Sequence, residues 1–387
     1  MERREFVRNM CYGGIATWAL PTVSFAQVRP GGRLVFVLLR GGFDGLAAVV
    51  PYGDPEYSAV RGTFAFNESE LAVLDETFGL APGLSPLRAL WDSNELAVLH
   101  AVAIPHRTRS HFDGQAILET GLDHPVGSSD GWLNRLLQVM SGRRAGIAIA
   151  AGMPLSLSGP YDVESWSPTK LGVMDDTFLE RLAVLYRSDA ALHGRFEAAV
   201  QQQDLVGEEP MARGNARRGR MTPLMQAAAR ILRQEQGPNI AAMEFSGWDT
   251  HANQGMAGGA LDRLLGQLAE GLVAFRTEIG AAWQTTTVIV MTEFGRTARP
   301  NGTRGTDHGT AGAGFVLGPR VSRARVVSDW PGLGPSALYE GRDLKPTLDT
   351  RAVLKGALAG TFDLTATQLE RVFPNSGSVR AIPELMA

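Results

Sequence analysis

Acidic and imidazole side chains follow several apolar segments of the sequence, at the point where each segment ends. The five residues of this kind are Asp44, Asp249, His251, Glu293 and His308. Carboxylate oxygens and imidazole nitrogens, without a thiolate, bind zinc, manganese, magnesium and calcium, and the share of histidine favours zinc or manganese. A single Asp beside Gly is common in turns and a single His is often structural, so the shared placement predicts a divalent metal site.

A hydroxyl group lies near one of these positions. Ser110 directly precedes His111 and a short helical pattern at Phe112–Leu118. A hydroxyl at a helix N-terminus, activated by a nearby metal, is placed to attack a phosphorus or sulfur centre. The alternative role of Ser110 is that of a helix N-cap. His111 and Thr108 are the competing catalytic candidates, so the attacking group stays open.

Arginines lie on the same segments, namely Arg40, Arg107, Arg109 and Arg296. Their guanidinium groups predict a clamp for a tetrahedral oxyanion, and Arg296 is the one that we expect to take part in catalysis. The alternative for each arginine is a solvated position at the surface. His100 and His124, in contrast, are interpreted as structural histidines.

Short apolar segments rich in β-branched residues alternate with helical patterns along the chain. The predicted strands are Leu34–Leu39, Leu96–Val102, Gly146–Ala150, Ile240–Phe245, Thr286–Thr292 and Gly314–Leu317. This alternation predicts an α/β fold with a mostly parallel central sheet and helices on both faces. Ligands of such sheets bind at the carboxyl ends of the strands, where the polar residues named above would converge.

Helices are expected between the strands, and Ala257–Ile279 has an apolar residue every three or four positions. The expected helices are Leu84–Trp91, Phe112–Leu118, Trp132–Met140, Phe178–Gln203, Pro223–Gln234, Ala257–Ile279 and Arg351–Ala359. The region from Met153 to Gln236 breaks the alternation of strands and helices. We therefore expect one domain over residues 27–387, with a helical insertion at about residues 153–236.

The N-terminus carries an export signal. The pair Arg3 and Arg4 precedes a weakly apolar stretch at Met10–Leu20, and Ser24–Ala26 offers a small-x-small cleavage site. This order predicts a twin-arginine signal peptide over residues 1–26 and a periplasmic or extracellular mature protein. Cys11 is the only cysteine and lies inside the signal, so no thiol is expected after cleavage.

The composition narrows the class of protein. The chain has 387 residues, 44% hydrophobic and 20% charged, as in ordinary globular proteins. A net charge of −3 provides no basic field for nucleic acid, which we exclude as a partner. No apolar segment reaches the roughly 18 residues that span a bilayer, so we expect no transmembrane segment in the mature chain.

Several motifs of the mature chain carry a resemblance to a known family. They are LLRGGFDG at 38–45, RSHFD at 109–113, GWDTH at 247–251, TEFGRT at 292–297 and DHG at 307–309. Together with the twin-arginine start, they resemble the exported bacterial "domain of unknown function 1501" family. That family is similar to the alkaline phosphatase and sulfatase superfamily, which implies an alkaline-phosphatase-like sheet between helices with one or two metals at strand ends.

The resemblance implies roles for individual residues. Asp44 matches the first metal-binding Asp of the superfamily, and Ser110 lies where the nucleophilic or metal-bridging hydroxyl begins a helix. Asp249 and His251 resemble the Asp and His of one metal site, although the spacing between these two ligands is usually wider in the superfamily.

The resemblance also implies roles for residues that follow the predicted strand Thr286–Thr292. Glu293 falls where an Asp-His pair is expected, and Phe294 stands in place of the second ligand. His308 looks like the late histidine of the superfamily, with Asp307 as its neighbour or as a replacement ligand. The sulfatase signature Cys/Ser-x-Pro-x-Arg is missing from the sequence, which disfavours a formylglycine sulfatase.

Two functional hypotheses follow from the sequence. The first is an exported metal-dependent hydrolase or transferase acting on a small-molecule or polymeric phosphate, sulfate or related ester. The second is a non-catalytic binding or assembly protein of the cell envelope, with a protein partner there. Phe294 in place of a ligand favours the second hypothesis, and fold alone does not separate the two.

The export signal is testable by substitution. Replacing Arg3 and Arg4 together by Lys is expected to retain the precursor in the cytoplasm, because the paired arginines are the feature of the signal that the export machinery reads. Cell fractionation measures the result, and N-terminal sequencing of the exported wild type should find the cut close to Ala26. Normal export of the double variant would contradict the assignment.

Overall fold

The computed structural model describes residues 31–125, 130–140, 145–150, 152–168, 186, 194 and 221–387. The predicted signal peptide lies outside the described residues, as does the predicted helix Phe178–Gln203 apart from Tyr186 and Gly194. Among the described residues, no helix is long and apolar enough to span a membrane.

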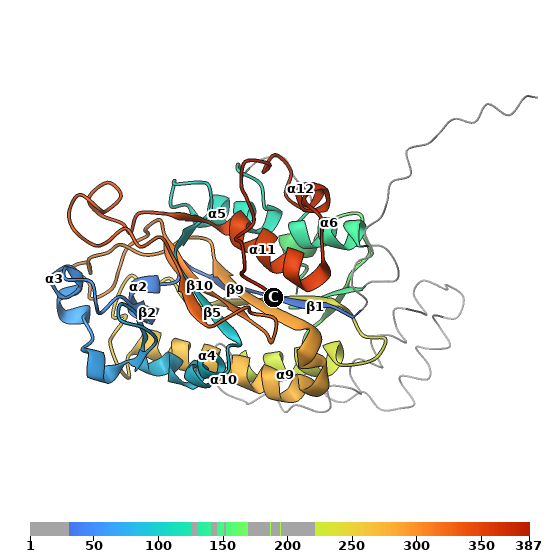
Figure 1. Ribbon diagram of the computed structural model, residues 1–387, viewed down its shortest axis with the longest axis horizontal. Coiled ribbons are helices and arrows are strands. Elements are labelled where there is room, and N and C mark those ends of the chain that lie inside the picture. Colours follow the sequence, from blue (N-terminus) through green and yellow to red (C-terminus); the bar gives the residue numbers. More distant parts are fainter. Residues whose placement is uncertain are drawn as a thin grey trace, which may run out of the picture.

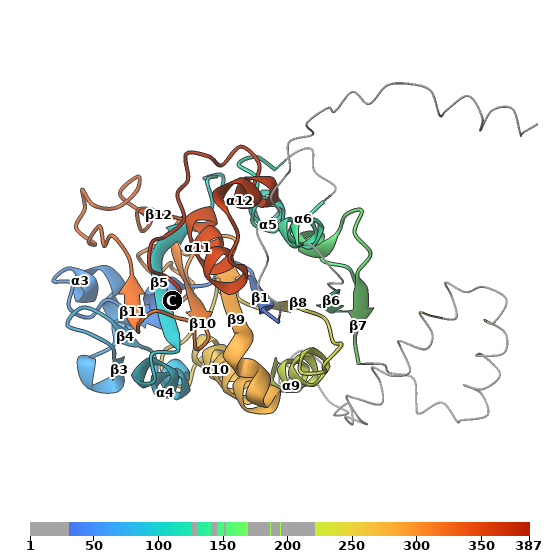
Figure 2. The same ribbon diagram turned by 45° about the vertical axis from the view of Figure 1, so that its right-hand side comes forward.

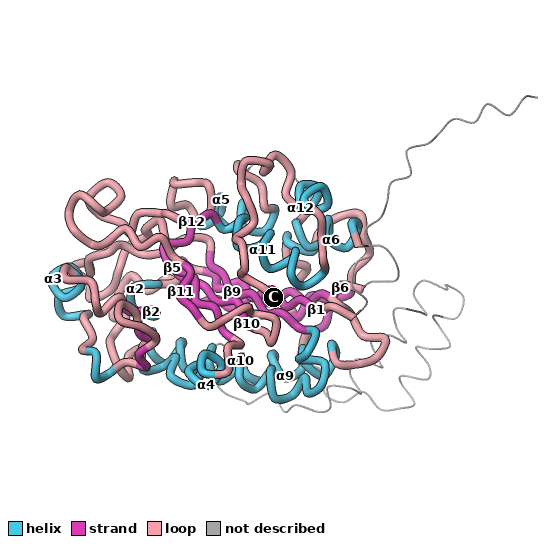
Figure 3. Tube along the Cα trace, viewed as in Figure 1, coloured by secondary structure: helices cyan, strands magenta, loops and turns pink. Residues whose placement is uncertain are grey.

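The strands of the described residues form two sheets (Figure 3). Their bounds are β1 (Arg33–Arg40), β2 (Val49–Val50), β3 (Ala72–Val73), β4 (Gly79–Leu80), β5 (Leu96–Ala103), β6 (Gly146–Ile149), β7 (Glu164–Trp166), β8 (Ile240–Ser246), β9 (Thr286–Thr292), β10 (Gly312–Leu317), β11 (Arg325–Val327) and β12 (Leu348–Asp349). The large sheet has the order β11-β5-β10-β9-β1-β8-β6-β7, and β12 pairs with β5 at its end (Figure 2). The small sheet has the order β2-β4-β3.

The large sheet is mostly parallel, as predicted. Strand β1 pairs in parallel with β8 and β9, and β6 pairs in parallel with β7 and β8. Strand β10 is the exception, because it runs antiparallel to both β5 and β9. All six predicted strands are present with bounds that differ by at most two residues.

The helices form a layer on each face of the large sheet (Figure 1). Their bounds are α2 (Gly45–Ala48), α3 (Tyr57–Arg61), α4 (Arg88–Asp92), α5 (His111–Thr120), α6 (Trp132–Val139), α9 (Met221–Leu232), α10 (Ala260–Ile279), α11 (Thr350–Phe362) and α12 (Ala366–Val372). Helices α4, α9 and α10 cover one face, and α5, α6, α11 and α12 cover the other. A central sheet between two helical layers is therefore confirmed.

The alternation of side chains along β1 explains the two layers. Val35 and Val37 belong to the hydrophobic core under α9 and α10, whereas Leu34 and Phe36 belong to the core under α6 and α11. Successive side chains of a strand point to opposite faces, so an uninterrupted apolar strand must be covered on both sides. The continuous apolar sequence of β1 thus requires helices on both faces.

Some elements differ from the sequence-based expectation. The predicted helix Leu84–Trp91 is a 3-10 helix at Pro82–Leu87 followed by the short α4, since Pro86 has no N–H for an α-helical hydrogen bond. Helices α2, α3 and α12 and the short strands β2, β3, β4, β7, β11 and β12 were not predicted. Strands of two or three residues are too short to show a period in the sequence.

The described ends of the expected insertion belong to the main body. Strand β7 extends the large sheet beside β6, and α9 packs along α10. Residues 169–185, 187–193 and 195–220 of this region lie outside the described residues.

His100 is a structural residue of the core, as interpreted from the sequence. Its Nε2 lies 2.9 Å from the carbonyl oxygen of Val49, and its Nδ1 accepts a hydrogen bond from the Ala101 N–H at 2.8 Å. These two contacts require the neutral ring with its proton on Nε2. Burial lowers the pKa of His100 to about 4, against the weaker opposing effects of the Val49 carbonyl and Asp44.

This buried ring predicts a pH dependence of stability. The folded protein has the lower His100 pKa, so the unfolded chain binds the proton more tightly, and stability falls as the pH drops from about 6.5 to about 4. The total loss is about 3 kcal/mol. Urea unfolding across this range should show a steeper loss for the wild type than for His100→Gln. The exposed His124→Gln serves as the control, and parallel profiles for the wild type and His100→Gln would contradict the interpretation.

Candidate metal centre

The topology brings four strand ends together at one edge of the large sheet. Strands β1, β8 and β9 are parallel neighbours, with Leu39 opposite both Phe245 and Thr292, so their carboxyl ends lie side by side. Strand β10 is antiparallel to β9 and therefore begins where β9 ends. The segments that follow β5, β8 and β9 supply the polar residues of the site.

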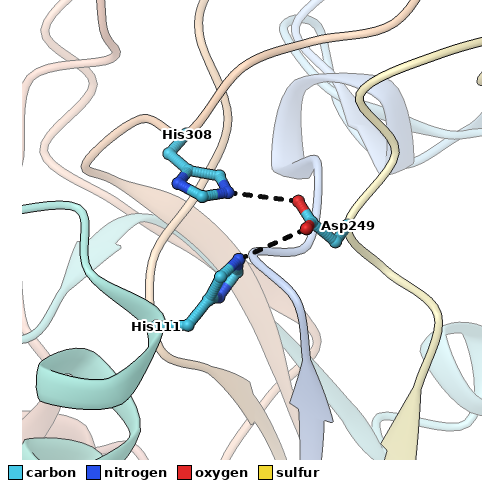
Figure 4. A group of neighbouring side chains, drawn as sticks. All are labelled: His111, Asp249 and His308. Atoms are coloured by element: carbon cyan, nitrogen blue, oxygen red, sulfur yellow. Dashed lines mark hydrogen bonds and ion pairs between the residues drawn. The ribbon is translucent and has the colours of Figure 1, made fainter.

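Three of these residues form a compact group (Figure 4). His111 begins α5, Asp249 follows β8, and His308 precedes β10. One ligand atom from each residue lies within 4.8 Å of the others. His111 Nε2 is 3.5 Å from Asp249 Oδ2, and His308 Nε2 is 3.2 Å from Asp249 Oδ1. Two imidazole nitrogens thus face the two oxygens of one carboxylate.

His251 brings a third imidazole to this group. Its Nε2 lies 3.0 Å from Asp249 Oδ1 and 2.9 Å from His308 Nε2. The side chains of Asp249 and His251 are each 43% exposed, so the group is open to solvent on one side. We refer to His111, Asp249, His251 and His308 as the four-residue cluster.

The outer nitrogen of each imidazole is held by an acceptor. His111 Nδ1 is 2.8 Å from Glu293 Oε1, and His251 Nδ1 is 3.2 Å from Asp307 Oδ1. His308 Nδ1 is 3.1 Å from the backbone carbonyl oxygen of Arg109. A carbonyl or carboxylate oxygen can only accept, so each neutral ring carries its proton on Nδ1. The three Nε2 atoms then direct lone pairs into the cluster.

This arrangement fits a divalent cation. His111 Nε2 is buried and has no hydrogen-bond partner in the described part of the chain. The Nε2 atoms of His251 and His308 are 2.9 Å apart, and their lone pairs repel each other unless a proton or a metal ion lies between them. Histidine ligands of metals donate their other N–H to a carboxylate or a backbone carbonyl, as all three rings do here.

The charges of the cluster also suit a cation. Asp249 receives a 2.6 Å hydrogen bond from Arg296 Nη1, whose guanidinium is fully buried. Burial would raise the pKa of Asp249, but Arg296, His251 and His111 together lower it below its usual value. With Glu293 and Asp307 included, the acids outnumber the arginine by two charges, which a divalent ion would balance.

The pKa of His111 shows the effect of its outer partner. The hydrogen bond to Glu293 raises this pKa, burial opposes the rise, and the charges of Glu293 and Asp249 add to it. Burial raises the pKa of Glu293, but hydrogen bonds from His111, Gln115 and the Gly41 N–H lower it further than that. Glu293 is therefore an ionised, fully enclosed acceptor that orients His111.

Asp44 lies outside the four-residue cluster. Its carboxylate is buried and accepts hydrogen bonds from Arg61 Nη2 at 2.8 Å, Gln254 Nε2 at 2.7 Å and the Ala47 N–H at 3.1 Å. The first two donors share Oδ2 and the third uses Oδ1. We therefore omit Asp44 from the ligands, because its carboxylate is committed to a buried ion pair and to capping α2.

Glu293 and Asp307, which the sequence predicted as metal-site residues, lie behind the cluster histidines. Each accepts the Nδ1 proton of a cluster histidine, and Asn301 Nδ2 also donates to Asp307 at 2.9 Å. That amide hydrogen bond, followed by the contact with His251, lowers the pKa of Asp307. Both carboxylates thus fix imidazole rings in place.

Ser110 is the N-cap of α5. Its Oγ accepts a hydrogen bond from the Asp113 N–H at 3.3 Å, which is the capping geometry that the sequence left open. The neighbouring His111, which the sequence offered as a competing catalytic residue, is the one that enters the cluster. The start of α5 thus supplies one imidazole of the four-residue cluster, and the Ser110 hydroxyl caps the helix.

The four arginines are engaged by protein acceptors. Arg40 pairs with Glu119 at 2.8 Å and with Glu244 at 2.6 Å, and Arg107 donates to the carbonyl groups of Ile104 and His106. Arg109 pairs with Asp343 at 2.8 Å. Arg296 donates to Asp249, to Thr306 and to the Gly41 carbonyl. The expected oxyanion clamp is not assembled by these side chains.

Phe294 packs against the cluster. Its ring centroid lies 4.8 Å from that of His111 and 5.2 Å from that of His308, and it is only 5% exposed. Gly42, at φ 71°, leaves room for this ring, because a Cβ there would lie 2.6 Å from it. From the sequence, Phe294 was interpreted only as a residue in place of a metal ligand. Its packing against histidines of other chain segments leaves no local pattern in the sequence.

A family comparison identifies the chain. Residues 90–373 match the family described as "Protein of unknown function (DUF1501)". The chain belongs to this family. The match includes every residue of the four-residue cluster, and it bears out the resemblance found in the motifs. No curated protein matches the chain.

Several solved structures are similar to this DUF1501 chain. The C-terminal periplasmic domain of EcEptC from Escherichia coli, in complex with Zn, is 12% identical, with a TM-score of 0.36 over 75% of this chain and 73% of that chain. The phosphonate monoester hydrolase of Agrobacterium radiobacter is 12% identical, with a TM-score of 0.34 over 76% and 70%. The PsFucS1 sulfatase from Pseudoalteromonas sp. is 14% identical, with a TM-score of 0.36 over 76% and 64%. At these scores the likeness carries no argument about activity.

The geometry predicts which substitutions abolish metal binding. Asp249→Ala and His308→Ala are expected to lose stoichiometric zinc, because each removes a cluster ligand atom. Asp44→Asn should keep the zinc but lose about 3–5 kcal/mol of stability, since it leaves Arg61 buried without its partner. Elemental analysis after dialysis and urea unfolding measure the two effects. A zinc-free Asp44→Asn protein that remains folded would restore Asp44 to the ligand set.

Proposed function

We propose that this DUF1501 protein is an exported, metal-dependent hydrolase or transferase that acts on a phosphate, sulfate or related ester. The observation that carries the proposal is the convergence of three imidazole Nε2 atoms on the Asp249 carboxylate, with every Nδ1 held from outside. Three nitrogens and a carboxylate favour zinc or manganese as the ion, and magnesium or calcium are compatible.

The protein's part in the reaction is to hold and orient. A divalent ion bound here would polarise an ester oxygen and increase the acidity of a water molecule. His111, His251 and His308 present their Nε2 atoms, and Glu293, Asp307 and the Arg109 carbonyl prevent the rings from turning. Arg296 holds the Asp249 carboxylate and keeps it ionised. Preorganised groups of this kind lower the cost of reorganisation during the reaction.

The surroundings of the cluster support an anionic ester as the substrate. Asp249 and His251 are about half exposed, so a small ester or the end of a polymeric one can approach from solvent. Helix α5 begins at the cluster, and its N-terminus contributes a partial positive charge there. We assign the attack on the ester to water, because the Ser110 hydroxyl is used as a helix cap.

A non-catalytic role is the second candidate. Two observations favour this role: Arg109 and Arg296 are paired with carboxylates of the protein, and Ser110 caps a helix. The candidate metal centre then has no side-chain nucleophile and no oxyanion clamp among these residues. In that case the protein would be a metal-binding or assembly component of the envelope, with a protein partner. For either role, the predicted twin-arginine signal supports a location in the periplasm or outside the cell.

Activity assays separate these roles. With zinc or manganese added, the wild type is expected to hydrolyse one of a set of nitrophenyl phosphate, phosphonate and sulfate esters, and Asp249→Asn should abolish turnover. Ser110→Ala should retain turnover and lose about 1 kcal/mol of stability, as expected for a lost N-cap.

The outcomes contradict the proposal in different ways. A loss of turnover of about 10²-fold or more in a folded, metal-loaded Ser110→Ala protein would make the hydroxyl the attacking group. Failure of the metal-loaded wild type to hydrolyse any of the esters would favour the envelope binding role.

A further inference from the structure

The acceptor for His308 Nδ1 is the backbone carbonyl of Arg109, a residue with an unusual backbone conformation. Arg109 adopts φ 59°, a left-handed conformation that non-glycine residues rarely adopt, and its carbonyl oxygen lies 3.1 Å from His308 Nδ1. The direction of this carbonyl depends on the Arg109 backbone. The contacts that fix Arg109 therefore decide where the His308 ring points.

Asp343 anchors the Arg109 side chain from outside the cluster. Arg109 Nε donates to Asp343 Oδ2 at 2.8 Å, and Arg109 Nη2 donates to Glu340 Oε2 at 2.5 Å. The Asp343 carboxylate is completely buried. Residue 343 is also bridged to Thr297 and Tyr339 through the backbone, so its position is fixed by neighbouring chain segments.

The same carboxylate orders a second contact to His308. Arg342 Nη1 lies 3.2 Å from Asp343 Oδ1 and donates to the His308 carbonyl oxygen at 3.0 Å. One Asp343 oxygen thus orients Arg109, which holds the ring of His308, and the other orients Arg342, which holds its backbone. No sequence motif singled out Asp343.

We propose that Asp343 is a positioning residue for the metal centre. Acting through Arg109 and Arg342, it sets the Nδ1–H tautomer and the orientation of His308, and thereby the affinity of the cluster for a divalent cation. This inference rests on the proposed metal site, and it assigns to a buried residue of the 339–343 segment a function at a site that it does not contact.

Zinc affinity tests the proposal through a double-mutant cycle. Asp343→Asn and Arg109→Ala are each expected to weaken Zn²⁺ binding about 10–100-fold, as other substitutions behind metal ligands do. The double variant should be no weaker than Asp343→Asn alone, because the loss of the Asp343 carboxylate already removes the support of Arg109 together with that of Arg342. Competition with a chromophoric chelator measures the affinity, and thermal unfolding shows that each variant is folded.

Asp54→Asn is the matched control. Asp54 is also a buried acid with several donors, namely the Glu56 N–H, Trp330 Nε1 and the Leu333 N–H, and it does not contact the cluster. It should leave the zinc affinity unchanged. Equal losses in Asp54→Asn and Asp343→Asn would overturn the proposal, and so would additive losses in the double-mutant cycle.

A measurement without metal keeps the proposal separate from the proposed function. In chelator-treated protein at pH 8, ¹⁵N spectra of the histidine side chains should show His308 as the Nδ1–H tautomer in the wild type and a mixture in Asp343→Asn. His308→Gln assigns the signal. If the wild type binds no zinc, the proposed function fails, and this spectrum alone then decides the role of Asp343. An unchanged tautomer in Asp343→Asn would overturn it.

Discussion

The lone pairs of three imidazole nitrogens, directed at one carboxylate, impose the electrostatic constraint on which this site depends. The 2.9 Å separation of His251 Nε2 and His308 Nε2 is unfavourable for two bare nitrogens, and a proton or a cation must compensate. Rotation of either ring would relieve the repulsion, but Asp307 and the Arg109 carbonyl hold the opposite nitrogens. The outer acceptors thus keep the three Nε2 atoms directed at the position that a cation would occupy.

The sheet makes this constraint possible. Parallel strands β1, β8 and β9 bring their carboxyl ends to one edge, and antiparallel β10 adds the segment that contains His308. Because His111 begins α5 and the other cluster residues lie within five residues of β8 or β10, the core limits how far these side chains can move apart. Each outer acceptor lies on a different segment from the histidine that it holds, so no single loop determines the geometry.

The sequence predicted the strands and the edge of the site well, because both depend on local patterns. Apolar β-branched segments define buried strands wherever they occur, and polar residues after them are visible directly. The exact ligands depend on contacts between distant segments, which the sequence does not display. Asp44 has the same local setting as Asp249, yet it is paired with Arg61 from α3, whereas Asp249 remains half exposed.

The roles of Ser110 and His111 show a second limit. The two residues are adjacent, and the sequence left open which of them takes part in the reaction. The N-cap position directs the Ser110 side chain back to the Asp113 N–H, while His111, at the first position of the helix, reaches Glu293 and Asp249. The exact start of the helix therefore separates the two roles, because the N-cap residue caps the helix and the next residue enters the cluster.

A buried polar chain connects the omitted Asp44 to the cluster. Gln254 donates to Asp44 and accepts from Thr306 Oγ1 at 2.8 Å, and Arg296 links Thr306 to Asp249. Thr306 thus fixes the Nε side of the Arg296 guanidinium, while its Nη1 donates to Asp249. The guanidinium groups of Arg296 and Arg109 are paired with carboxylates of the protein. An anion that reaches the cluster would therefore be attracted mainly by a bound cation and by the N-terminus of α5. If the proposed cation binds here, its removal would leave the site with excess negative charge, so the cation and an anionic ligand should bind with positive coupling.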